Sequence, residues 1–271
     1  MRAGLTVGIT CGTEAKATFT LETGGQASTR GAWIVLWTVL LASVAAAFNQ
    51  YKVPALLPIL MQSFGVDLVD AAWLVSAFSV TGVLLALPSG LILYRLGSRT
   101  TGIAGLGFVL AGCLMGSVPL GINVFLASRV VEGVGLGLVV VVSPALIAEW
   151  FPPACRGLPM GIYAIWLPVG AVLAFSVAPG LAGVGGWELA WWAGAAVSLV
   201  AIVVYIVMIH GGRPLLDADR TDSALDLRVF FANRDIWLLS AAFTCACIAM
   251  GEPPWESWRL PELESGGMRL F

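Results

Sequence analysis

Charged residues are scarce in this chain. Among its 271 residues, only 11% are Asp, Glu, Lys or Arg, whereas 59% are hydrophobic and the mean hydropathy is +0.92. Soluble domains are about half apolar and carry about a quarter charged residues. The composition therefore excludes an ordinary soluble domain and indicates a polypeptide whose solvent is largely lipid.

Residues for metal, redox or hydrolytic chemistry are equally few. The chain has a single histidine, His210, and five cysteines without a C-x-x-C pair, so it cannot assemble a typical zinc site, and no cofactor is expected. No H-E-x-x-H or G-x-S-x-G motif is present, which argues against an enzyme. The basic residues form no stripe, so nucleic acid is excluded as a partner. Cys113 lies in an apolar run and is expected to be a small buried hydrophobe.

Long apolar runs occupy most of the chain. Each is near or above the roughly 20 residues that a helix needs to cross the hydrocarbon of a bilayer. Backbone groups inside lipid must be paired within their own segment, so the runs are predicted to be helices. The sequence thus predicts an all-α, polytopic bundle of six transmembrane helices over 32–210, with the runs 32–63, 69–94, 101–121, 122–150, 157–183 and 187–210.

The positive charges predict which side each connection occupies. Connections on the cytoplasmic side of membrane proteins are enriched in Lys and Arg. With six crossings, ten cations lie on one side, and the alternate gaps 65–68, 118–122 and 183–187 contain none. We therefore expect an integral protein of the bacterial inner membrane with a cytoplasmic amino terminus, its inner cations being Arg2, Lys16, Arg30, Arg95, Arg99, Arg156, Arg213, Arg220, Arg228 and Arg234.

The segments outside the six runs are polar or incomplete. Residues 1–31 have no apolar signal stretch and are expected to be a disordered cytoplasmic leader, and 211–235 are expected to be a cytoplasmic linker with mixed charge. A seventh apolar run starts at about 236 and is interrupted after Met250, which leaves about 15 residues, too few to cross comfortably. Residues 236–271 are therefore interpreted as an incomplete seventh helix and a divergent tail of a truncated protein.

The connection between the second and third runs carries a motif. Residues 88–99 read PSGLILYRLGSR, which resembles the signature G-x-x-x-D-[RK]-x-G-[RK]-[RK] of the major facilitator superfamily. Tyr94 stands where that family has an aspartate that joins a gating network. A basic turn flanked by helix-packing glycines accounts for the segment equally well. The resemblance predicts a cytoplasmic gating loop formed by Gly90, Tyr94, Arg95, Gly97 and Arg99.

A second motif places charge at membrane depth. Residues 129–137 read RVVEGVGLG and resemble the family pattern R-x-x-Q-G-x-G, with Glu132 in place of the glutamine. A charge inside a membrane is expensive unless it is paired or faces a wet cavity, so Arg129 is a candidate functional residue. Glu132 lies on the same helix face, and Gly133 with Gly137 forms a strip for close helix packing. Two interpretations stay open: a self-neutralising pair that stabilises packing, or a pair that handles substrate or protons.

Polar residues also interrupt the first run. Residues 49–58 read NQYKVPALLP, so the polar group Asn49, Gln50 and Lys52 precedes two prolines that are expected to break the helix. Broken helices at mid-depth are common binding sites in secondary transporters. Asn49 and Lys52 share a helix face. Lys52 either extends toward the outer surface or faces an internal cavity, and we favour the cavity.

Two weaker resemblances extend the pattern along the chain. The loop EWFPPACRG at 149–157 is similar to the proline, acid and arginine loop of the same family, and the fifth run, with Gly170 and Pro179, is similar to a degenerate helix-packing motif of its antiporters. The resemblance covers about residues 32–250. Within the family, 49–58 and the end of the second run look most like the cyanate and nitroimidazole permease branch.

This resemblance implies a function. The chain looks like the amino-terminal six-helix half of a secondary active transporter, which moves a small solute by alternating access through a site between two halves. Lys52 and Arg129 would favour an anion, and Glu132 would moderate that charge or carry a proton, so coupling to a proton or ion gradient is expected. The alternative is a non-transporting membrane protein, either an inert truncated product or a half-bundle. The expected partners are lipid, a small-molecule substrate, and a second copy or a complementary half.

Overall fold

The computed structural model describes residues 9–11, 15–17, 29–119 and 121–209. These residues belong to the first of two units into which the chain divides, Met1–Ala218, and the second, Asp219–Phe271, lies outside the described residues. The predicted linker 211–235, the incomplete seventh helix and His210 therefore stay predictions. Near the amino terminus, β1 (Ile9–Cys11) and β2 (Ala15–Ala17) pair in antiparallel fashion.

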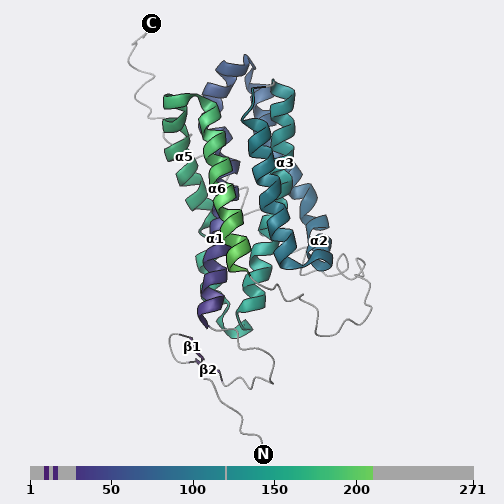
Figure 1. Cartoon of the computed structure of the whole chain (residues 1–271), viewed down its shortest axis with the longest axis vertical. Coiled ribbons are helices and arrows are strands. Elements are labelled where there is room, and N and C mark those ends of the chain that lie inside the picture. Colours follow the sequence, from purple (N-terminus) through teal and green to yellow (C-terminus); the bar gives the residue numbers. More distant parts are fainter. Residues whose placement is uncertain (1–8, 12–14, 18–28, 120, 210–271) are drawn as a thin grey trace, which may run out of the picture. The chain divides into compact units, whose positions relative to one another are not determined.

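Helices make up almost all of the rest (Figure 1). Their bounds follow the apolar runs closely, and α1 begins three residues before the predicted start at 32. The elements are α1 (Thr29–Phe64), α2 (Leu68–Gly116), α3 (Ile122–Trp150), the short 3-10 helix η1 (Pro153–Cys155), α4 (Gly157–Tyr163), α5 (Trp166–Gly185) and α6 (Trp187–Met208).

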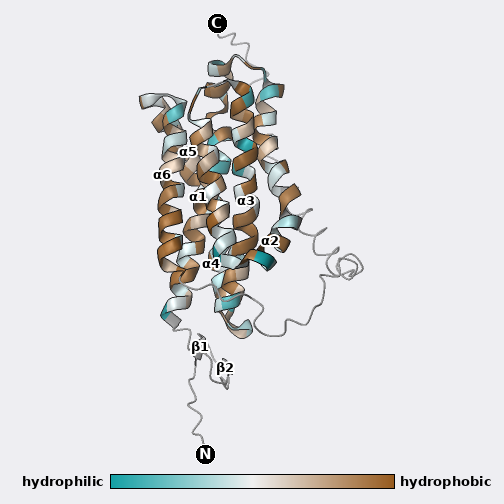
Figure 2. Ribbon diagram, turned by 45° about the vertical axis from the view of Figure 1, so that its right-hand side comes forward, coloured by the Kyte–Doolittle hydropathy of each residue, from teal (hydrophilic) through white to brown (hydrophobic). Residues whose placement is uncertain are grey.

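These helices have the length and composition of membrane spans. Within the described ranges, five segments are long and apolar enough to cross a bilayer, namely Arg30–Phe64, Pro88–Gly116, Ile122–Trp150, Gly157–Gly185 and Trp187–Met208, and Val69–Gly82 is a shorter apolar helix. Figure 2 shows hydrophobic residues along the whole length of the helices, outer faces included. The protein is an all-α transmembrane helix bundle, as the sequence predicted.

Gly97 divides α2 into two arms. Its φ of 79° and ψ of 165° are open to glycine alone in practice, so the helix breaks there. Before Gly97, the packing of α2 against α3 advances from the neighbourhood of Phe78 and Gly133 to that of Gly82 and Gly137, whereas after Gly97 it runs the other way. The chain therefore reverses at Gly97, and α2 supplies two of the six predicted crossings.

Two helices differ from their predicted continuity. The expected break in the first run is wrong, because α1 continues through Pro54 and Pro58 as one helix of 36 residues. In a membrane, neighbouring helices and local adjustments accommodate the backbone groups that a proline leaves unpaired. The fifth run is instead interrupted at residues 164–165, between α4 and α5. Pro168 in the first turn of α5 has no N–H to bond the carbonyl of Ala164, which explains the interruption.

Small residues permit the close helix contacts. A methyl group on Gly133 would lie 2.6 Å from the carbonyl oxygen of Phe78, and one on Gly137 would lie 3.1 Å from that of Gly82, so the predicted packing strip is confirmed. Gly170 of α5 packs in the same way against Ala47 of α1. These contacts bring the first arm of α2 close to α3, and α5 close to α1.

Candidate functional site

Charged side chains from α1 and α3 meet inside the bundle. Nζ of Lys52 lies 2.9 Å from Oε1 of Glu132, and the guanidinium of Arg129 pairs with Oε2 of the same carboxylate. Arg129 also donates to the backbone carbonyl of Asn49, at 3.1 Å. One carboxylate thus bridges two cations, and the bridge joins the first helix to the third.

Polar groups from α1, α2 and α6 complete this arrangement. Lys52 donates to Oδ1 of Asn49 at 2.8 Å, and the thiol of Cys113 donates to the same oxygen at 3.0 Å. The amide nitrogen of Asn49 in turn donates to Oγ of Ser198 at 3.0 Å. We refer to Asn49, Lys52, Cys113, Arg129, Glu132 and Ser198 as the charge cluster.

Aromatic rings and glycines enclose the charge cluster. Nζ of Lys52 lies 4.5 Å from the centroid of the Trp191 ring, and the guanidinium carbon of Arg129 lies 4.5 Å from that of Phe78. Both distances are within the range of cation–π attraction. Gly112 and Gly194 provide the space, because a methyl group on either would overlap Glu132 or Asn49.

The charge cluster is fully buried and carries an excess of positive charge. Each of its members has 0% of its surface exposed. In their ordinary ionised forms, two cations face one carboxylate, so the net charge is positive. In addition, Nε of Arg129 and Nε1 of Trp191 are buried N–H donors without an acceptor among the described residues. Because unpaired donors and net charge are both expensive to bury, the site favours an electron-rich group.

The prediction that Asn49 shares a face with Lys52, and Glu132 with Arg129, is confirmed by their direct contacts. Lys52 does not extend to the outer surface, since it is fully buried. It meets other side chains of the bundle rather than an open cavity. Gln50 is half-buried, and its Oε1 atom is buried with no hydrogen-bond partner in the described part of the chain. The transport roles of these residues stay predictions.

Sequence reasoning missed three members of the site. Cys113 was expected to be a buried hydrophobe, and it is buried, but its sulfur contacts Asn49 and Lys52. Ser198 and Trp191 lie in α6, a strongly apolar helix in which the sequence pattern does not distinguish them from packing residues. A seven-residue spacing between these two residues places them on one face of α6, which is the only signal that the sequence offered.

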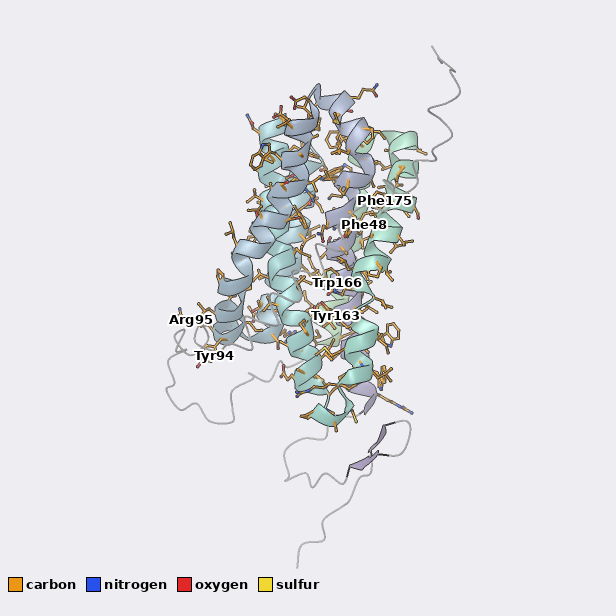
Figure 3. The ribbon with its side chains drawn as sticks, turned by 180° about the vertical axis from the view of Figure 1, so that it is seen from behind. Phe48, Tyr94, Arg95, Tyr163, Trp166 and Phe175 are labelled. Atoms are coloured by element: carbon orange, nitrogen blue, oxygen red, sulfur yellow. The ribbon has the colours of Figure 1, made fainter. Side chains whose placement is uncertain are left out.

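The predicted gating loop is only partly tied to the bundle. Tyr94 and Arg95 are exposed and extend away from the end of the first arm of α2 (Figure 3). A methyl group on Gly90 would meet nothing within 4 Å, so its predicted role in close helix approach is not supported among the described residues. Arg99 instead donates to the carbonyl of Ile206 on α6, at 3.4 Å.

Other groups hold this end of the bundle together. Ser98 donates to the carboxylate of Glu149 on α3 at 3.3 Å, and the hydroxyl of Tyr205 on α6 donates to the carbonyl of Ser98 at 3.1 Å. Deeper in the bundle, Tyr163 of α4 lies 3.1 Å from Ser43 of α1 (Figure 3). The residue in the aspartate position of the family motif therefore takes no part in these contacts.

Comparisons with known proteins agree with this architecture. A sequence profile of the Major Facilitator Superfamily matches residues 39–258. The chain is 26% identical to the uncharacterized MFS-type transporter YcnB of Bacillus subtilis, over 58% of this chain and 32% of that protein. It is 22% identical to the galactose-proton symporter of Escherichia coli, over 72% of this chain and 41% of that protein.

Solved structures show the same fold at low identity. The inward-open xylose transporter XylE of E. coli has a TM-score of 0.60 and 15% identity, over 68% of this chain and 49% of that one. A peptide transporter POT crystallised with sulfate has a TM-score of 0.59 and 19% identity, over 82% and 48% of the two chains. The chain thus spans about half the length of these structures and about a third of the first curated relatives, at 32%. From the profile match and the helix bundle together, we conclude that the chain belongs to the Major Facilitator Superfamily.

Proposed function

We propose that this chain forms a six-helix half of a secondary active transporter that moves a small anionic solute by alternating access. The observation that carries the proposal is the net positive, fully buried charge cluster between α1 and α3. Family membership supports transport in general. The second half of the transporter would come from further sequence, from a second copy or from another chain.

The charge cluster supports an anion as the solute. A buried excess of positive charge is stabilised when a negative group approaches it, and the effect is strong in a medium of low dielectric. The unpaired donors on Arg129 and Trp191 would supply hydrogen bonds to that group. Because every member of the charge cluster is fully buried, the solute would reach it only when the helices rearrange, as alternating access requires.

A second candidate substrate is a neutral sugar or polyol. The galactose-proton symporter of E. coli and a myo-inositol transporter of Cryptococcus neoformans are among the relatives, the latter 31% identical over 42% of this chain. In that case, the charge cluster would serve proton coupling, with Glu132 as the group that accepts and releases the proton. The finer assignment to a cyanate or nitroimidazole permease rests on residues 49–58 and the end of the second run, and it stays a proposal.

Uptake into liposomes tests the proposal. Purified full-length chain, in monomeric and oligomeric fractions, would be reconstituted and offered labelled nitrate, formate and galactose with and without an inward proton gradient. We expect uptake of an anion that falls at least tenfold in Arg129→Ala, because the buried carboxylate loses one of its two cationic partners and the solute loses the donors of Arg129. Arg30→Ala, which changes an exposed cation outside the charge cluster, is the matched control.

The outcomes of this experiment are distinct. Galactose uptake that depends on the proton gradient would replace the anion with the second candidate. Anion uptake of equal rate in the wild type and in Arg129→Ala would contradict the role of the charge cluster. Absence of flux above empty liposomes in every fraction would contradict transport by this chain and favour the non-transporting alternative.

We also propose that the chain lies in the bacterial inner membrane with its amino terminus in the cytoplasm. The support is the distribution of cations, since the gap 118–122 between α2 and α3 has none, whereas the turn at Gly97 carries Arg95 and Arg99. An epitope tag inserted in the gap 118–122 should react with antibody in intact spheroplasts. A tag that reacts only after the membrane is permeabilised would contradict this orientation.

A further inference from the structure

Two aromatic side chains of α6 fit against glycines in the second arm of α2. We call the spaces at these glycines glycine notches. A methyl group on Gly116 would lie 2.5 Å from Nε1 of Trp191, and a methyl group on Gly102 would overlap the ring and hydroxyl of Tyr205. Both aromatic residues are almost completely inaccessible, at 0% and 1% exposed. Each ring therefore fills space that exists only because its partner lacks a side chain.

The two contacts have the same spacing on both helices. Trp191 and Tyr205 are fourteen residues apart on α6, as are Gly102 and Gly116 on α2, and the order is reversed between the helices. Fourteen residues correspond to two seven-residue repeats, or four turns of about 3.5 residues, the period at which two packed helices keep one seam in contact. The pair thus forms an antiparallel seam with a matched aromatic and glycine near each end.

This register places Cys113 of α2 and Ser198 of α6 along the seam between the two ends. Counting inward from the matched pairs sets Gly194 opposite Cys113, and Ser198 opposite Val109. Gly194 leaves room for the amide of Asn49, which donates to Ser198. That amide's oxygen accepts hydrogen bonds from both Cys113 and Lys52. The position of α6 along α2 therefore determines whether Asn49 can hold Lys52 beside Glu132.

We propose that Trp191 and Tyr205, seated at Gly116 and Gly102, act as positioning residues that fix the register of α6 and thereby assemble the charge cluster. Other registers are blocked by the neighbouring side chains. A slip of one turn, about 5.4 Å, would set Tyr205 against the buried Leu106. In the other direction, Trp191 would meet Gly112, whose space Glu132 already occupies.

Residues next to the turn at Gly97 form hydrogen bonds with the end of α6 that lies along the same seam. Tyr205 donates from its notch to the carbonyl of Ser98, and Arg99 donates to the carbonyl of Ile206. These bonds tie the end of α6 to the residues directly after the reversal of α2. A displacement of the turn would therefore be transmitted along α6 to Ser198 and Asn49, which links the motif at 88–99 to the charge cluster.

The reactivity of Cys113 tests the proposal without reference to any solute. In a full-length chain with the other four cysteines changed to serine, the buried thiol should react slowly with a membrane-permeant maleimide. Gly102→Ala should displace Tyr205 and raise the labelling rate at least tenfold. Gly107→Ala lies on the same arm with nothing within 4 Å of its added methyl, so it should label like the parent chain.

A compensating change separates displacement from misfolding. In the double variant Gly102→Ala with Tyr205→Ala, the clash between the added methyl group and the ring is removed and Trp191 still lies against Gly116, so labelling should be slower than in Gly102→Ala alone. Labelling of the double variant as fast as that of Gly102→Ala would overturn the proposal, because the effect of Gly102→Ala would then not depend on the Tyr205 ring. Labelling of Gly102→Ala at the rate of Gly107→Ala would overturn it as well.

Disulfide crosslinking tests the register directly. In a cysteine-free background, the pair Val109→Cys and Ser198→Cys should crosslink under copper phenanthroline, whereas Val109→Cys with Ile202→Cys, one turn along α6, should not. Adding Gly102→Ala should lower the crosslinking of the first pair several-fold. Equal crosslinking of the two pairs in the parent chain would contradict the register.

Discussion

Replacement of Glu132 by glutamine should destabilise the bundle by about 3 to 5 kcal/mol, the usual effect of removing one partner from a buried ion pair. The carboxylate is fully buried and forms ion pairs with both Lys52 and Arg129. Glutamine keeps the size of the side chain but leaves two cations without a counter-charge in a dry interior. The folded state would then have to bury unpaired charge or admit water.

Replacement of Lys52 by methionine, in contrast, should not lower the stability of the bundle. It removes the excess positive charge and leaves Arg129 paired with Glu132, so the charge cluster becomes neutral. Methionine has a similar length and fills the space of the aliphatic stem, and Cys113 still donates to Asn49. Stability should therefore be unchanged or higher, because a buried charge in excess costs more than an apolar replacement.

Thermal unfolding in detergent, followed by tryptophan fluorescence, measures both effects. The midpoint should fall clearly for Glu132→Gln and should not fall for Lys52→Met. Arg30→Met, at an exposed position, is the control and should match the wild type. Equal losses for Glu132→Gln and Lys52→Met would mean that the three charges contribute as neutral hydrogen-bonding groups. If uptake is lost in Lys52→Met while stability is retained, Lys52 acts in transport rather than in folding.

The large features of the fold were predictable because their causes are local. Apolar runs long enough to cross hydrocarbon must be helices, and this follows from composition alone. The turn at Gly97 was predictable as well, since glycine is the residue that tolerates a positive φ between two helices. The same local reasoning failed at Pro54 and Pro58, because whether a proline breaks a helix depends on what the neighbouring helices supply.

The two same-helix pairs of the site could be predicted from the sequence, but the contact between the pairs could not. Residues three apart on a helix lie on one face, so Asn49 with Lys52, and Arg129 with Glu132, could be paired from their spacing. The contact that joins the two pairs, between Lys52 and Glu132, spans eighty residues of sequence and depends on tertiary packing. Cys113 and Ser198 were missed because they themselves lie in stretches of α2 and α6 that look uniformly apolar.

For the glycines that enclose the site, close packing could likewise be predicted, but the packing partner could not. A glycine in a transmembrane helix indicates close packing, but the sequence does not say against which partner. Gly90 and Gly107 face open space, whereas Gly112 and Gly194 lie against the charge cluster. Only the structure distinguishes the two kinds, and the difference has a measurable consequence for Gly112.

Replacement of Gly112 by alanine should destabilise the protein by about 1 to 3 kcal/mol, the range typical of an overfilled core. The added methyl would lie 2.8 Å from the backbone nitrogen of Glu132 and 2.8 Å from the carbonyl oxygen of Ser128. These are backbone atoms of α3, so they cannot turn aside as a flexible side chain can. The second arm of α2 would have to move away from α3, which separates Cys113 from the other members of the charge cluster.

Gly107→Ala is the matched control and should change stability in the other direction. It lies on the same arm of α2, and its added methyl meets nothing within 4 Å. In a helix interior, alanine is favoured over glycine by about 0.5 to 1 kcal/mol, so this variant should be as stable as the wild type or more stable. Unfolding midpoints in detergent should therefore move apart, down for Gly112→Ala and up for Gly107→Ala. Midpoints that move together would mean that α2 and α3 are packed too loosely for the glycine notch to hold the charge cluster in place.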